Sequence, residues 1–71
     1  MPNRVVNYHI GRLKDKNPEV RLKSINELRL IGDPEALGAL EEVFRTDPEI
    51  EVRKAAQAAG YEIFTKQQKK A

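Results

Sequence analysis

A short motif occurs twice in this sequence, and the repeat constrains the fold more than any other feature. Glu19-Val20-Arg21 recurs 32 positions later as Glu51-Val52-Arg53. Internal similarity at a period of 20 to 50 residues is typical of solenoids and other arrays of stacked units. The preceding pairs, Asn17-Pro18 and Asp47-Pro48, are offset by only 30 positions. The second copy is therefore predicted to carry two extra residues before its Val-Arg.

The first copy, from Asn17 to Gly32, has the signals of a complete helix. Asn17 has an acceptor side chain suited to capping, and Pro18 has the fixed φ that the first helical position favours. Glu19 places a negative charge near the positive end of the helix dipole. Gly32 can adopt the left-handed conformation that ends a helix. Asp33-Pro34 follows at once, so the next helix must lie antiparallel to this one.

Apolar residues recur at helical spacing along most of the chain, and no strand pattern occurs. The sequence predicts an all-α fold with a single domain over residues 1–65. Its helices are expected at about 3–15, 18–31, 34–45 and 48–64. Residues 66–71, which hold three lysines and no apolar residue before the terminal alanine, are expected to fray as a basic tail.

The repeated segments resemble two HEAT-like repeats of the short type found in phycobilisome-lyase-related proteins. The positions that match this pattern are Pro18, Val20, Arg21, Gly32, Asp33, Pro34, Ala36, Leu37, Leu40, Asp47, Pro48, Val52, Arg53 and Ala56. The sequence departs from the pattern where Gly60 stands in the place of Leu28. The resemblance implies an α-solenoid fragment of two stacked helical hairpins, with the first and third helices outside and the second and fourth inside. It also implies either an adaptor or an accessory subunit in bilin attachment, bilin detachment or phycobilisome assembly.

The charge distribution argues against nucleic acid as the main partner. The net charge is +2, but Lys66, Lys69 and Lys70 lie in the tail, which leaves ten cations against eleven acids before it. A nucleic-acid-binding domain usually carries a basic patch on its folded part. Binding through the tail, with Tyr61 and Phe64 upstream, remains the weaker alternative.

Composition also limits the compartment. The chain has no cysteine, which suits a reducing cytoplasm, and it has no apolar run of membrane-spanning length and no secretory signal. We therefore expect a soluble cytoplasmic protein without membrane contact.

No motif in the sequence predicts catalysis, a cofactor, a metal site or a small-molecule substrate. His9 is the only histidine, whereas a metal site needs several ligands. Arg21 and Arg53 have two interpretations. They could bind an acidic partner or a tetrapyrrole propionate, or they could bond neighbouring turns with Asp33 and Asp47 as acceptors. The second interpretation is favoured because both copies keep the arginine beside the packing valine.

The small size of the array points to a protein partner or to a homo-oligomer. Stable solenoids usually need about three repeats, because each end of the stack exposes an apolar surface. We therefore predict a small protein-interaction module. The candidate contact residues, which are apolar and fall outside the main stripes, are Val5, Tyr8, Leu22, Leu30 and Phe64.

Overall fold

The computed structural model describes residues 3–68, and within that range it contains four α-helices and no strand. The helices are α1 (Arg4–Arg12), α2 (Pro18–Ile31), α3 (Leu37–Thr46) and α4 (Ile50–Gln68). A 3-10 turn, η1 (Pro34–Ala36), leads into α3. The predicted all-α class is confirmed.

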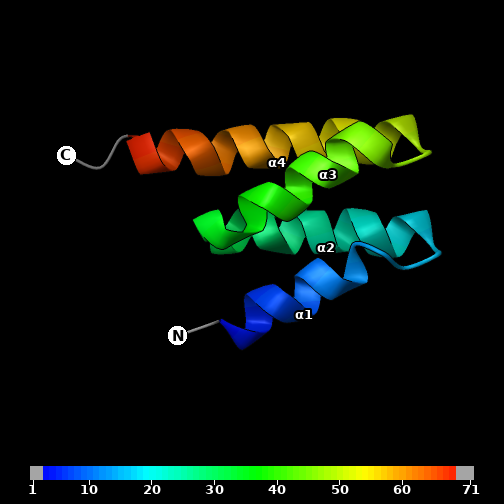
Figure 1. Ribbon diagram of the computed structural model, residues 1–71, viewed down its shortest axis with the longest axis horizontal. Helices are drawn as coiled ribbons and strands as arrows, with labels where there is room; N and C mark the ends of the chain where they lie inside the picture. The colour runs from blue at the N-terminus through cyan, green and yellow to red at the C-terminus, as the bar shows by residue number, and fades with distance from the viewer. Residues whose placement is uncertain (1–2, 69–71) are drawn as a thin grey trace.

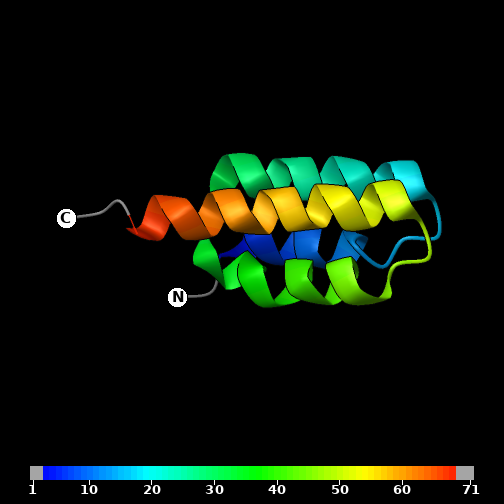
Figure 2. The same ribbon diagram turned by 90° about the horizontal axis from the view of Figure 1, so that it is seen from above.

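The helices form two hairpins that stack side by side (Figure 1). α2 and α4 lie next to each other and run in the same direction, and α1 and α3 lie on the other side of the molecule (Figure 2). The main contacts join α1 to α2, α3 to α4, and α2 to α4. The structure therefore has the two layers that the resemblance implied.

Side-chain caps begin α1 and α2, and the start and stop signals of α2 act as predicted. The Asn3 side chain accepts hydrogen bonds from the backbone N–H groups of Val5 and Val6, and Asn17 caps α2 by accepting from Glu19 at 2.9 Å. Gly32 ends α2 in the left-handed conformation, with φ 74°. The Asn17 side chain and the backbone conformation of Gly32 therefore explain both ends of α2.

Four boundaries differ from the prediction by two residues or more. α3 begins at Leu37 rather than at residue 34, because Pro34–Ala36 form the 3-10 turn η1. α1 ends at Arg12 rather than near residue 15, because Asp15 turns the chain by accepting from the backbone N–H of Asn17 at 2.9 Å. α4 begins at Ile50 rather than at residue 48, because the Asp47 side chain accepts from Glu49 N–H and the Glu49 carbonyl accepts from Arg53 N–H. α4 also continues to Gln68, so residues 66–68 are helical rather than frayed. The rest of the predicted tail lies outside the described residues.

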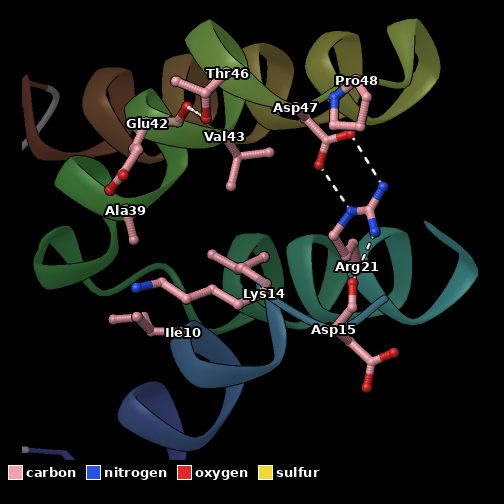
Figure 3. Close-up of a pocket in the computed structure, with 11 residues that line it drawn as sticks. Ile10, Lys14, Asp15, Arg21, Ala39, Glu42, Val43, Thr46, Asp47 and Pro48 are labelled. Carbon is pink, nitrogen blue, oxygen red and sulfur yellow. Dashed lines mark hydrogen bonds and ion pairs between the residues drawn. The ribbon is translucent and has the colours of Figure 1, made fainter. Parts of the chain in front are cut away.

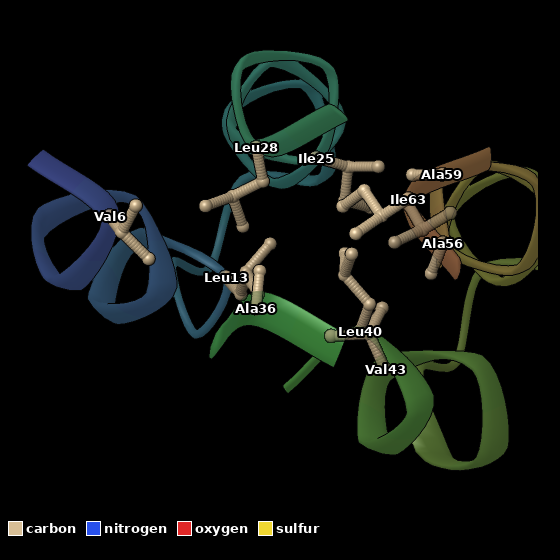
Figure 4. Packing of buried hydrophobic residues seen from close by; sticks show 11 residues of the cluster. Val6, Leu13, Ile25, Leu28, Ala36, Leu40, Val43, Ala56, Ala59 and Ile63 are labelled. Atoms are coloured by element: carbon tan, nitrogen blue, oxygen red, sulfur yellow. The ribbon is translucent and has the colours of Figure 1, made fainter. Parts of the chain in front are cut away.

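One hydrophobic core lies between the two layers (Figure 4). Side chains from all four helices converge on it, as the helical spacing of the apolar residues predicts. Its fully or almost fully buried members are Val6, Leu13, Ile25, Leu28, Ala36, Leu40, Val43, Val52, Ala56, Ala59 and Ile63. Because each hairpin contributes to the same core, neither hairpin buries its apolar stripe alone.

Candidate protein-binding surfaces

Arg21 is a buried arginine that joins the two hairpins (Figure 3). Its Nε donates to Oδ2 of Asp47 at 2.7 Å, and its Nη2 donates to Oδ1 of the same carboxylate at 3.1 Å. Its Nη1 donates to the backbone carbonyls of Asp15 at 2.7 Å and Lys16 at 3.1 Å. All three guanidinium nitrogens are therefore used within the chain, which leaves no nitrogen uncommitted for a propionate. The guanidinium therefore bonds the first hairpin to the second.

Arg53 is the counterpart of Arg21 in the second hairpin, and it makes only part of the same pattern. Its Nη1 donates to the Asp47 carbonyl at 2.6 Å, as Arg21 Nη1 donates to the Asp15 carbonyl. In each case the acceptor lies six residues earlier. No acceptor for the Nε or Nη2 of Arg53 occurs between residues 3 and 68. Asp33 was expected to accept from these arginines, but this prediction is wrong because its side chain caps η1 by accepting from Glu35 N–H.

The hydrogen bonds also correct the predicted alignment of the two copies. Asp15 accepts from the N–H of Asn17 as Asp47 accepts from the N–H of Glu49, each at 2.9 Å. Asp15 is therefore the structural counterpart of Asp47, at the same offset of 32 as Arg21 and Arg53. The Asp and the Arg are six positions apart in both copies, so no two-residue insertion precedes Val52.

A cleft of about 340 Å³ lies between the outer helices α1 and α3, with the Arg21–Asp47 pair at one end (Figure 3). Its remaining polar side chains include Lys14, Glu42 and Thr46, and Thr46 is engaged with the carbonyl of Glu42 at 2.8 Å. Apolar side chains such as Ile10 and Val43 form the rest of its wall. Both groups of the ion pair are used within the chain, whereas the side chains of Lys14, Asp15 and Glu42 have no ion-pair partner among the described residues.

The first hairpin forms the α1–α2 hollow, which is lined by Tyr8, His9, Arg12, Val20, Lys23, Ser24 and Glu27. The Arg12 guanidinium lies 5.6 Å from the Tyr8 ring centroid, a cation–π distance, and the rings of Tyr8 and His9 meet edge to face at 5.1 Å. Nδ1 of His9 is buried and has no hydrogen-bond partner among the described residues. Charged and aromatic groups thus share this end of the stack.

The second hairpin forms the α3–α4 groove, which has a volume of about 350 Å³ and is mostly apolar. Gly60 lies on α4 opposite Leu40 of α3, and the aromatic side chains of Phe44, Tyr61 and Phe64 surround it. Tyr61 is 70% exposed and Phe64 is 50% exposed. Its other lining residues are Leu37, Leu40, Glu41, Ala56 and Gln57. Phe44 and Tyr61 were not among the protein-contact residues predicted from the sequence. The signal in the sequence was their position, since Phe44 lies four residues after Leu40 and Tyr61 follows Gly60.

The five predicted contact residues do not form one surface. Tyr8 lines the α1–α2 hollow and Phe64 lines the α3–α4 groove. Val5 and Leu30 are exposed but line neither. Leu22 is half-buried and packs against the core beside α4, so its off-stripe position is explained within the chain.

No helix between residues 3 and 68 is long and apolar enough to cross a membrane. The same part of the chain contains no group of three or more His, Asp or Glu residues placed to hold a metal ion.

Comparison with known proteins identifies one family. The sequence matches the family described as HEAT repeats over residues 2–60. Neither the curated proteins nor the solved structures contain a match. HEAT repeats commonly mediate protein–protein interactions.

Proposed function

Because this chain belongs to the HEAT-repeat family, we propose that it is a small protein-interaction module without catalytic activity of its own. The observation that carries the proposal is the α3–α4 groove, where Phe44, Tyr61 and Phe64 surround the recess at Gly60. Aromatic side chains are enriched at the energetic centres of protein interfaces because they bury a large area at low entropic cost. An apolar groove of this kind supports a protein ligand, either another protein or another copy of this chain.

The groove fits a protein surface better than a small polar substrate. Among the described residues, Glu41 is the only charged one that lines the groove, and the groove lies in the surface formed by a single hairpin. Small-molecule sites usually enclose most of the ligand and present several convergent polar groups. A protein partner instead needs exposed aromatic side chains that it can cover, and Tyr61 and Phe64 provide them.

The test is capture with a matched pair of variants. Tyr61→Ser/Phe64→Ser removes two exposed aromatic groups from the groove, and Val5→Ser/Leu30→Ser removes two apolar groups that are 55% and 61% exposed elsewhere. Each protein is immobilised and exposed to lysate from its source and to a differently tagged copy of itself. Circular dichroism and urea unfolding verify that both variants remain folded.

We expect the wild-type chain and the Val5→Ser/Leu30→Ser variant to retain the same protein. The groove variant should bind the purified protein at least about tenfold more weakly, which corresponds to about 1.4 kcal/mol. Equal retention by the groove variant, or no retention by the wild-type chain, would contradict the proposal.

The finer assignments are separate proposals. An accessory role in bilin handling rests on the sequence resemblance to the phycobilisome-lyase-related type. Titration with a free bilin and with a purified phycobiliprotein tests it, and absence of binding to both would count against it. A cytoplasmic location is proposed from the lack of cysteine. Nucleic-acid binding through the tail predicts an affinity that falls steeply with salt and disappears when residues 66–71 are removed.

A further inference from the structure

We propose that a second copy of this chain stacks on the α3–α4 end of the first, and that Arg53 of one copy binds Asp15 of the next. This contact would repeat the Arg21–Asp47 pair that already joins the two hairpins. The inference rests on the proposed interaction function and names its partner. Two observations support it. Arg53 is a donor without a carboxylate partner among the described residues, and Asp15, in the first hairpin, is a carboxylate without a cation partner there.

The donor half is Arg53. Arg21 uses Nη1 for the loop before its own helix, and it uses Nε and Nη2 for the carboxylate of the following hairpin. Arg53 makes the first of these contacts at 2.6 Å and has no partner for the other two nitrogens within residues 3–68. A guanidinium presents Nε and Nη2 as a planar fork that matches a carboxylate. Arg53 therefore lacks the acceptor that a third hairpin would supply.

The acceptor half is Asp15. Asp47 accepts from Glu49 N–H and still receives both donors of Arg21. Asp15 makes the equivalent bond to Asn17 N–H, and its carboxylate has no cation partner in the described part of the chain. In Figure 3 this carboxylate points away from Arg21 and Asp47. Asp15 thus has the position that Asp47 has in the existing interface. Its carboxylate is available for the donors that Asp47 accepts from Arg21.

The interface between the hairpins is the template for this contact. Within one chain, α2 presents Arg21 to the loop before α4, and Leu22 and Ile25 pack near Ala55, Ala58 and Ala59. Stacking another first hairpin on the α3–α4 end would continue the array in the same direction. It would also cover the aromatic side chains of the α3–α4 groove with the α1–α2 hollow, which contains Tyr8 and Val20.

Complementary charge favours this head-to-tail arrangement over a symmetric pair of identical ends. Two α3–α4 ends facing each other would offer Arg53 no carboxylate equivalent to Asp47. A head-to-tail contact brings the two unmatched groups together, one from each copy. Contacts of this type are heterologous, so each copy keeps a free end that can accept a further copy.

The test is charge reversal followed by complementation. Asp15→Arg and Arg53→Asp are prepared singly, mixed in equal amounts, and combined in one chain. Glu51→Arg is the matched control, because it reverses an exposed charge on the same helix as Arg53, and its counterpart Glu19 does not line the existing contact between α2 and α4. Sedimentation velocity measures the mass of each sample from about 10 µM to about 1 mM, the range in which weak association is detectable. Urea unfolding confirms that every variant is folded.

We expect the mass of the wild-type chain and of Glu51→Arg to rise with concentration. Each single reversal should weaken association at least tenfold, because it places like charges in contact. The equimolar mixture should associate again, because the Arg53 that one variant keeps can meet the Asp15 that the other keeps. At the following contact, the arginine introduced at position 15 of one variant meets the aspartate introduced at position 53 of the other, which is the same pair with its charges exchanged. The doubly reversed chain should also associate by itself.

Two results would overturn the inference. One is a wild-type chain that stays monomeric up to about 1 mM. The other is a wild-type assembly that Asp15→Arg leaves unchanged. A symmetric contact between two α3–α4 ends would give that result, because it does not involve Asp15. If the groove variant still loses a protein ligand while charge reversal has no effect, the interaction function stands and only the second copy as partner is excluded.

Discussion

The two hairpins carry equivalent arginines, but Arg21 and Arg53 have different surroundings. Arg21 is buried and donates to three residues, whereas Arg53 is half-buried and, within the described residues, donates only to the Asp47 carbonyl. The sequence around both is the same, Glu-Val-Arg. The difference shows that the hydrogen bonds of the repeat arginine depend on the hairpin that follows it, rather than on the motif.

The largest expected effect separates these two arginines. Arg21→Ala should lower the free energy of unfolding by about 3–5 kcal/mol, because it leaves the buried Asp47 carboxylate without its cation. Arg53→Ala should cost only about 1 kcal/mol, the worth of one hydrogen bond. Urea unfolding followed by circular dichroism measures both. Equal losses would show that the following layer is not what distinguishes them.

The core position that differs between the repeats gives the next largest effect. Leu28 is fully buried, whereas its counterpart in the second hairpin is Gly60. Leu28→Ala should cost about 2–5 kcal/mol through lost burial and cavity formation, which would largely unfold so small a domain. The control is Leu30→Ala, whose side chain is 61% exposed and which should change stability by less than about 0.5 kcal/mol. A cost below about 1 kcal/mol would show that Leu28 is not central.

Two glycines should respond to alanine with opposite signs. Gly32 has φ 74°, so Gly32→Ala should cost about 1 kcal/mol or more. Gly60 lies within α4, and an added Cβ would meet only Leu40 Cβ at 4.0 Å, an ordinary contact. Gly60→Ala should therefore stabilise the chain by about 0.5–1 kcal/mol. Thermal unfolding of both variants measures the difference, and destabilisation by Gly60→Ala would indicate that Leu40 leaves no room for the added methyl group.

The smallest effect concerns the second ion pair between the hairpins. Nη1 of Arg29 lies 3.3 Å from Oε2 of Glu62, and both side chains are more than a third exposed. A double-mutant cycle with Arg29→Gln and Glu62→Gln should give a coupling below about 0.5 kcal/mol, reduced further by salt. A coupling as large as the loss at Arg21 would mean that burial does not separate the two pairs.

Much of the fold could be predicted from local signals. Asn17, Pro18 and Gly32 set the limits of α2 through interactions within a few residues, so sequence was sufficient there. Val52, Ala56, Ala59 and Ile63 are buried, because their helical spacing places them on one side of α4.

The candidate site was less predictable, because it depends on contacts between distant segments. The predicted insertion before Val52 came from aligning two X-Pro pairs, but the structure aligns Asp15 with Asp47 through their equivalent hydrogen bonds. Phe44 belongs to the apolar pattern of its helix, and only the position of α4 shows that it borders an open groove. Leu22, in contrast, was expected at a partner surface and packs within the chain.

The sequence by itself determined four helices, their punctuation and the repeat, because capping, glycine conformation and helical periodicity act over one or two turns. Only the tertiary structure decided which residues are paired and which are left over. Arg21 and Arg53 are indistinguishable within their motifs, yet one has a carboxylate from the next hairpin and the other does not. Whether such a group is satisfied depends on what packs beside it, and that depends on segments more than twenty residues away.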